Sequence, residues 1–323
     1  MKHIFSKTKA FLALCIGWAM LTTSCINEYL DDCYTLTLKV VNSSGEDITE
    51  GDAVVDAGLY IYDENGKYLE TVTLSASQIK SHTPVEINYP ATAKLQIVAW
   101  GNTEGSEQTV SAGSTISDLT LQLANRTATV LEHPRDLFFG NDEDIPLNAG
   151  VLTQNEVVVI SPKVGRLQMR TENLERGMEL WREQNGLRAD EDLTFDFYFN
   201  KTSSRVGADG SVAGADEGLS HNPEAMLTEE GEWDMFPLED GFENVLPGML
   251  QEGVFYVNGR PYETQPIDDI TQAEIKVEED HETIVIFRWT SEGEFLGIDV
   301  NIRVIVRPWG DGGDDEPPLT PQR

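Results

Sequence analysis

The chain has 323 residues, 40% of them hydrophobic, and carries 56 acidic against 23 basic side chains, for a formal net charge of −33. A protein with this charge repels nucleic acid and anionic lipid, so both are excluded as partners of its surface. The hydrophobic fraction is sufficient for packed cores. At about 150 residues per domain, the length predicts two domains.

The first 24 residues have the composition of a secretory signal peptide. Three lysines among the first nine residues precede an apolar run over residues 10–21, and small polar residues follow as far as Ser24. The run is shorter than the roughly 20 apolar residues that a membrane-spanning helix needs. A charged start, a short apolar stretch and small residues at its end are typical of a cleaved signal. We therefore expect residues 1–24 to be removed, with cleavage between Ser24 and Cys25.

Cys25 directly follows the small residues, which makes the segment resemble the signal of a bacterial lipoprotein, where this cysteine receives the lipid. Polar Thr22 stands where such signals usually have an aliphatic residue. An ordinary signal peptide followed by a chance cysteine stays open as the alternative. Each buried methylene of an acyl chain contributes about 0.8 kcal/mol, so several chains on Cys25 would retain the protein in a membrane.

Residues 25–33 form a short acidic tether between the signal and the body of the protein. This tether is either a solvated linker or a signal for display outside the cell. Cys33 has no partner within the mature chain, because Cys15 leaves with the signal and Cys25 is taken by the lipid. Cys33 is therefore either a small residue beside the tether or a reactive thiol.

After residue 33 the sequence predicts β-strands throughout. Residues 34–40 alternate polar and apolar side chains, which is the period of a half-buried strand. Asn65-Gly66 lies between two such runs and indicates a hairpin, since both residues tolerate a positive φ. Many short strands separated by Gly, Asn and Pro favour β-sandwiches. The expected strands are 34–40, 59–62, 68–74, 85–88, 94–100, 119–123, 127–131, 157–160, 167–171, 193–199, 254–257, 273–277, 283–289 and 298–306.

One segment could form a helix instead of a strand. The apolar residues between Leu174 and Trp181 fall on one helical face, and Gly186 would end such a helix. Gly177 in the middle weakens the pattern, so helix and non-helix both stay open.

Two further segments lack a periodic apolar pattern. Residues 207–221 are small, polar and acidic, and we expect them to form a long surface loop. Residues 310–323 are rich in Gly, Asp and Pro, so we expect a disordered acidic tail that cannot bury apolar surface.

Motifs for catalysis or metal binding are absent from the sequence. The histidines have none of the spacings of metal sites, and there is no nucleophile elbow or phosphate-binding glycine loop. The acidic residues 141–144 lack the spacing of a calcium loop, which favours a solvated acidic loop over a calcium site. The hypothesis that the protein is a secreted hydrolase is supported only by the abundance of acidic residues. We expect no catalytic residue, no cofactor and no metal.

Aromatic residues recur at strand periodicity. We expect them to be core or edge residues of strands rather than a platform for a ligand. They are Tyr60, Tyr62, Phe195, Phe197 and Tyr198.

Several segments together resemble the FimB-type anchor lipoproteins of Bacteroidales type V fimbriae. Each segment is unspecific alone, and their order and spacing carry the likeness from Cys25 to Trp309. Residues 164–166 depart from it, because relatives often have a more basic, Ala-rich stretch there, and this leaves the domain boundary open. The matching segments are the acidic gap from Cys25 to Cys33, residues 34–40, 59–67, 95–101, 136–140 and 157–166, and the last strand up to Trp309.

The resemblance implies two transthyretin-like Greek-key β-sandwich domains, which we place at residues 34–160 and 161–309. It implies an anchor or accessory subunit of a fimbrium that is no enzyme, sits in the outer membrane through acylated Cys25 and is exposed at the cell surface. Its partners would be fimbrial subunits, one of which adds a strand to it. Residues 310–323 could not donate a strand in return, which would place the chain at the end of the polymer.

A glycan-binding surface lipoprotein is the alternative function. In that case exposed aromatic residues, such as Trp181 or Trp233, would stack on sugars.

Overall fold

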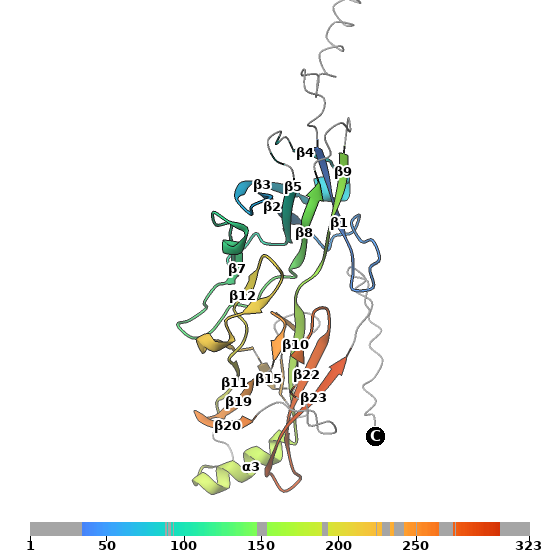
Figure 1. Ribbon diagram of the computed structural model, residues 1–323. Helices are drawn as coiled ribbons and strands as arrows, with labels where there is room; N and C mark the ends of the chain where they lie inside the picture. Colours follow the sequence, from blue (N-terminus) through green and yellow to red (C-terminus); the bar gives the residue numbers. More distant parts are fainter. Residues whose placement is uncertain are drawn as a thin grey trace, which may run out of the picture.

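The structure, a computed structural model, describes residues 34–303 with short internal gaps. The predicted signal peptide, tether and tail lie outside the described residues. Figure 1 shows two lobes arranged end to end, with β10 leading from the first into the second. Strands dominate both lobes, which confirms the all-β fold class. The gaps are residues 88, 90, 91, 93, 147–153, 189–192, 224, 228–232, 236–241, 250, 265–273 and 275.

The first lobe is built on a seven-stranded sheet in the order β3-β2-β5-β8-β9-β1-β4. Neighbouring strands are antiparallel except for β1 and β9, which run parallel with Tyr34 opposite Gln154. A short helix, α2 (Ala76–Lys80), connects β3 to β4. The strands are β1 (Tyr34–Val40), β2 (Asp56–Asp63), β3 (Tyr68–Ser75), β4 (Val85–Ile87), β5 (Lys94–Gly101), β8 (Phe138–Pro146) and β9 (Gln154–Pro162).

The hairpin predicted at Asn65-Gly66 is confirmed. β2 and β3 pair in antiparallel fashion, and Gly66 adopts a φ of +74°. The carboxylate of Asp63 accepts hydrogen bonds from the backbone N–H groups of Asn65 and Lys67, at 2.9 Å each. These bonds satisfy the donors of the turn and fix the register of the two strands.

The central strands of this sheet bury side chains on both faces. On β5, Ile97 and Ala99 lie in one core, whereas Val98 and Trp100 lie in another. We call the first the inner core, to which β1, β2, β5, β8 and β9 all contribute, and the second the outer core, which lies on the other face of β5. The consecutive apolar residues of β5 reflect this two-sided burial.

The outer core is covered by a four-stranded sheet in the order β13-β12-β7-β6. Its apolar contributions include Leu121 of β7 and Val206 of β12, both fully buried. The strands are β6 (Gln108–Ser111), β7 (Thr120–Leu123), β12 (Arg205–Gly207) and β13 (Val212–Ala213), with short 3-10 turns at Ile116–Asp118 and Ala215–Glu217. Two of these four strands therefore come from the second half of the chain.

The second lobe contains two facing sheets, β15-β16-β10-β22-β23 with β17 beside β10, and β14-β11-β19-β20. β10 and β22 run parallel, as β1 and β9 do in the first lobe. Between the sheets lies the second-lobe core, rich in phenylalanine. The strands are β10 (Gly165–Glu172), β11 (Phe195–Asn200), β14 (Ser220–His221), β15 (Ala225–Leu227), β16 (Trp233–Met235), β17 (Glu243–Val245), β18 (Gly248–Met249), β19 (Glu252–Val257), β20 (Arg260–Thr264), β21 (Lys276–Val277), β22 (Glu282–Trp289) and β23 (Phe295–Arg303).

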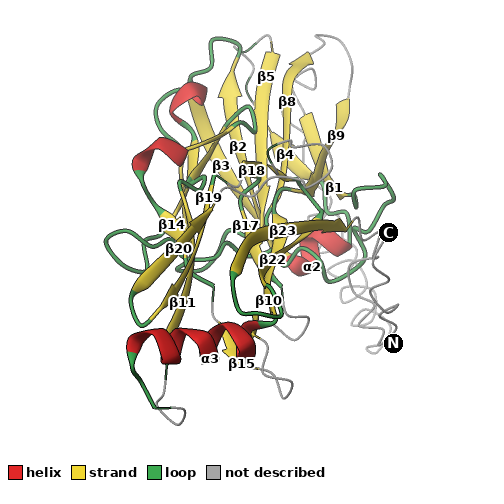
Figure 2. Ribbon diagram, turned by 90° about the horizontal axis from the view of Figure 1, so that it is seen from below, coloured by secondary structure: helices red, strands yellow, loops and turns green. Residues whose placement is uncertain are grey.

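The segment that begins at Leu174, for which the sequence allowed either a helix or an irregular structure, forms a helix. This helix, α3 (Leu174–Asn185), lies across the end of the second lobe (Figure 2). Gly177, which weakened the helix pattern, has a packing role. A Cβ at this position would lie 2.6 Å from Cδ1 of Trp289. Gly186 ends the helix with a φ of +68°, as predicted.

Three local predictions were wrong. Residues 127–131 form isolated bridges rather than a strand. Residues 141–144 belong to β8 rather than to an acidic loop. Residues 207–221 are not a surface loop, because they include β13 and β14, and Ser220 and His221 are buried.

The last predicted strand, 298–306, is confirmed as far as it is described. β23 begins earlier, at Phe295, and pairs with β22 in antiparallel fashion. Residues 304–306 lie outside the described residues. The division into domains at residue 160 stays a prediction.

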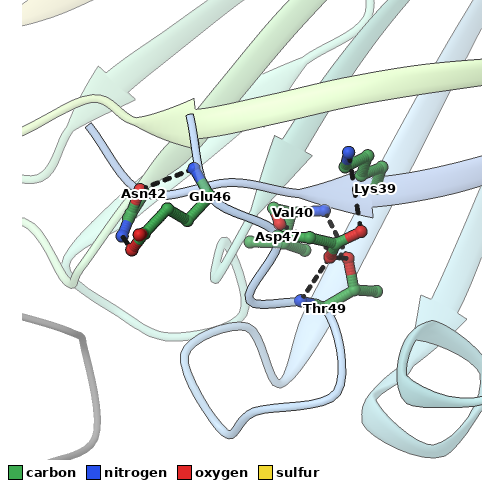
Figure 3. A network of polar contacts seen from close by, with 6 residues as sticks. All are labelled: Lys39, Val40, Asn42, Glu46, Asp47 and Thr49. Atoms are coloured by element: carbon green, nitrogen blue, oxygen red, sulfur yellow. Dashed lines mark hydrogen bonds and ion pairs between the residues drawn. The ribbon is translucent and has the colours of Figure 1, made fainter. Parts of the chain in front are cut away.

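Side chains close the turn that follows β1 (Figure 3). The side-chain oxygen of Asn42 accepts a hydrogen bond from the backbone N–H of Glu46 at 2.9 Å. The hydroxyl of Thr49 accepts one from the backbone N–H of Val40 at 2.8 Å and donates to Asp47 at 2.6 Å. Hydrogen bonds from Thr49 lower the pKa of Asp47. The turn thereby satisfies the backbone donor at the end of β1, where water is excluded.

At Gly140, β8 lies very close to the backbone of β9. A Cβ built there would lie 1.9 Å from the backbone oxygen of Val159, which cannot move without shifting β9. We expect Gly140→Ala to destabilise the protein by about 1–3 kcal/mol or more, the usual range for overpacking. Urea unfolding followed by circular dichroism measures this.

Gly207→Ala is the matched control for this substitution, because its Cβ would come closest to the side chain of Asp209, at 3.0 Å, and would meet a backbone atom only at 3.9 Å. Equal stability of the Gly140→Ala variant and the wild type would contradict the close approach of the two strands.

Candidate functional site

The residues predicted for membrane attachment, Ser24 and Cys25, lie outside the described residues, as does Cys33. The first described residue, Tyr34, opens β1 and pairs with Gln154 at the start of β9. β9 then runs toward β10 and the second lobe (Figure 1). The chain therefore enters the described body at the end of the first lobe that is remote from the second lobe.

Sheet edges are the surfaces on which a strand from another subunit could be added. Most edge strands of the described chain are short, such as β4, β6 and β14, and β20 contains Pro261. Two edge strands are longer, β3 with 8 residues and β23 with 9. The start of β3 is already bonded, because Tyr68 donates its backbone N–H to Ser114.

β23 is the long edge of the second lobe. It pairs with β22 on one side, and no other strand of the described part of the chain pairs with its outer side. The register is interrupted beside Leu296 and is then regular from Gly297 to Arg303. Leu296 has 63% of its surface exposed, the most of the exposed large apolar side chains.

Four of the five aromatic residues expected in cores or at edges lie in or against a core, whereas Tyr198 of β11 is half-buried and packs on Tyr256. Tyr62 is fully buried in the outer core, with Tyr60 packed against it. Burial raises the pKa of Tyr60 to about 12. Phe197 lies in the second-lobe core, and Trp181 packs against that core instead of standing free on the surface. The side chain of Trp233 lies outside the described residues.

The two lobes share a junction formed by residues 202–222. After β11 the chain crosses to the first lobe, forms β12 and β13, and returns as β14. Val206 pairs with Leu121 and lies in the outer core. The backbone N–H of Leu123 donates to the carbonyl of Ser204 at 2.9 Å.

The return of the chain at β14 makes further bonds to the first lobe. The backbone N–H groups of Leu131 and Ser220 donate to Ser220 and Thr129, respectively, at 2.9 Å each. The guanidinium of Arg126 donates to the carbonyl and side-chain oxygens of Asn222 at 2.6 and 2.7 Å. Sequence reasoning missed this junction, because its strands have two or three residues each and no period to detect.

Lys163, between β9 and β10, also contacts both halves. Its ammonium forms an ion pair with Glu279 and lies 5.5 Å from the ring centre of Phe139. The backbone N–H of Lys163 donates to Leu137. Asn244 of β17 donates to the carboxylate of Asp136 at 2.7 Å. The connection between the lobes is therefore fixed by several polar contacts as well as by packing.

Two histidines that are 88 positions apart in the sequence meet at the junction. The rings of His133 and His221 stack with centroids 5.3 Å apart and an interplanar angle of 24°. Nε2 of His133 lies 2.8 Å from Oε2 of Glu243, within ion-pair distance but without the alignment of a hydrogen bond. Burial, reinforced by His133 and Arg126, holds the pKa of His221 well below its usual value.

The described residues show no other centre of chemistry. Within them, no group of three or more His, Cys, Asp or Glu side chains could hold a metal ion. No helix of the described chain is long and apolar enough to cross a membrane.

Comparison with known proteins gives one family for most of the chain. Residues 30–311 match the family described as "Fimbrillin-A associated anchor proteins Mfa1 and Mfa2". The major fimbrium anchoring subunit FimB, from two strains of Porphyromonas gingivalis, is 27% identical over 169 residues, which cover 51% of this chain and 54% of FimB. The chain thus spans about half the length of the curated relatives it matches.

Solved structures share the fold at low sequence identity. The fimbrial anchor protein Mfa2 from Porphyromonas gingivalis matches with a TM-score of 0.55 and 13% identity, covering 84% of this chain and 98% of Mfa2. A Bacteroides thetaiotaomicron structure described as putative polysaccharide binding proteins matches with a TM-score of 0.55 and 15% identity, covering 85% of this chain and 98% of that one.

Proposed function

The chain belongs to the family of fimbrillin-A associated anchor proteins, and from this premise we propose that it attaches a fimbrium to the outer membrane through acylated Cys25. The observation that carries the proposal is the family match over residues 30–311, which includes both lobes. The relatives are fimbrial anchoring subunits rather than enzymes.

Attachment at Cys25 gives the protein an orientation. Nine positions separate Cys25 from Tyr34, where β1 begins at the end remote from the second lobe. A lipid on Cys25 would therefore hold the first lobe toward the membrane and the second lobe away from it. The fimbrium would then meet the second lobe.

We propose that the next subunit adds a strand along the outer edge of β23. This is the long edge of the lobe that would face away from the membrane, and it is regular over Gly297–Arg303. Strand addition forms many backbone hydrogen bonds at once, and neighbouring side chains supply specificity. Residues 310–323, with their Gly, Asp and Pro, do not suit donation of a strand in return. An acceptor that does not donate would terminate the fimbrium.

The lipid anchor is tested by Cys25→Ala. We expect the variant to leave the membrane fraction and to melt at the same temperature as the wild type, because residues 25–33 separate the lipid from β1. Cys33→Ala, the matched control, should stay in the membrane fraction. Metabolic labelling with palmitate should mark the wild type and Cys33→Ala only. An unlabelled wild type would show that Cys25 carries no lipid.

The docking edge is tested by Leu296→Lys. A charge on an edge strand opposes strand addition, so the variant should lose binding to purified fimbrial subunits. Its stability should change by less than about 0.5 kcal/mol, because Leu296 is a surface residue. Val55→Lys, at a side chain that is 45% exposed in the first lobe, is the control and should bind normally. Undiminished binding by Leu296→Lys would exclude the edge of β23.

A further inference from the structure

The stacked histidines join segments that belong to different lobes. His133 lies in the first-lobe connection between β7 and β8, and His221 lies on β14, which pairs with β11 of the second lobe. The ring stack reinforces the backbone bonds of the adjoining Leu131 and Ser220. A change in the charge of either ring therefore acts directly on the contact between the lobes.

The surroundings of the pair can balance one positive charge and not two. Glu243 of β17 faces His133 at 2.8 Å and would neutralise a proton on that ring. His221 has 2% of its surface exposed, and neither ring nitrogen has a hydrogen-bond partner among the described residues. The charged group on its side is Arg126, which has the same sign as a protonated ring.

A small cavity with room for about one water molecule lies beside His221. The described residues that line this cavity offer no counter-charge. Those beside His221 are apolar or carry a hydroxyl: Leu167, Phe199, Thr202, Ser203, Val245 and Leu246. Burying a second, unbalanced charge here is costly, because the medium is of low polarity.

We propose that the His133–His221 pair makes the junction between the lobes acid-sensitive: uptake of a second proton loosens the contact of residues 129–133 with β14. At neutral pH the stacked rings hold the two segments together. In acid the rings repel each other, and the contact of residues 129–133 with β14 weakens. This device does not depend on which subunit the protein anchors.

The direction of the pH dependence follows from His221. Its pKa in the folded protein is below the value of 6.5 for an unperturbed histidine, so the folded state favours the neutral ring. The contribution of the neutral His221 ring to folding stability is complete above about pH 6.5. This contribution is lost as the pH falls below 6.5, until the folded-state pKa is reached. The unfolding constant should rise by up to about tenfold per pH unit over that window.

Urea unfolding of the protein without its predicted signal peptide, between pH 7.5 and 5.5, tests the proposal. The unfolding constant of the wild type should rise as the pH falls. That of His221→Phe, which keeps an aromatic ring without a titrating nitrogen, should not rise in this way. His82→Asn is the matched control, because His82 is exposed with a φ of +48°, which Asn tolerates, and this variant should behave as the wild type. Equal pH dependence in wild type and His221→Phe would overturn the proposal.

Two measurements on the wild type alone keep the proposal testable if His221→Phe does not fold. Hydrogen exchange, corrected for the intrinsic effect of pH, should show at least fivefold less protection of the amides of Leu131 and Ser220 at pH 5.5 than at pH 7.5. In NMR spectra the pKa of the His221 ring should lie below the value of 6.5 for an unperturbed histidine. Unchanged protection at the junction, or titration of His221 near pH 6.5, would each overturn the proposal.

Discussion

The pairing of β12 with β7 is the contact on which the first lobe depends. It places Val206, from the second half of the chain, in the outer core beside Leu121 and Trp100. Burying a large apolar side chain contributes about 1.5–3 kcal/mol, and the whole domain is stable by only about 5–15 kcal/mol. Removing the cover from the outer core would expose several such side chains. The first lobe therefore includes strands from both halves of the chain.

The order of the strands would resist a pull along the length of the protein. Tyr34 lies at the far end of the first lobe, and β9 continues through Lys163 into β10 of the second lobe. A pull between Tyr34 and the second lobe acts along β1 and β9, which are parallel and share seven register pairs. Such a pull shears all of these bonds together instead of opening them one at a time. The shared outer core and the polar contacts of Lys163 oppose separation of the lobes.

Sequence reasoning predicts this structure best where a local pattern, such as an alternating strand or a turn, is sufficient to define the element. The alternation in residues 34–40 and the Asn65-Gly66 turn required no knowledge of distant residues. β12, β13 and β14 could not be found in this way, because strands of two or three residues have no measurable period. The stacking of His133 on His221 depends on the same crossing of the chain. Gly177 was ambiguous, since only Trp289 explains why a helix has glycine there.

The central claim, that the first lobe requires β12 and β13, is tested most directly with the fragment 34–164. Trp100 is its only tryptophan and is fully buried in the outer core of the intact protein, so its fluorescence reports on that core alone. The account predicts red-shifted emission and no cooperative thermal transition in the fragment. Emission as blue as that of buried tryptophan, together with a cooperative melt, would show that the first lobe folds alone and would contradict the account.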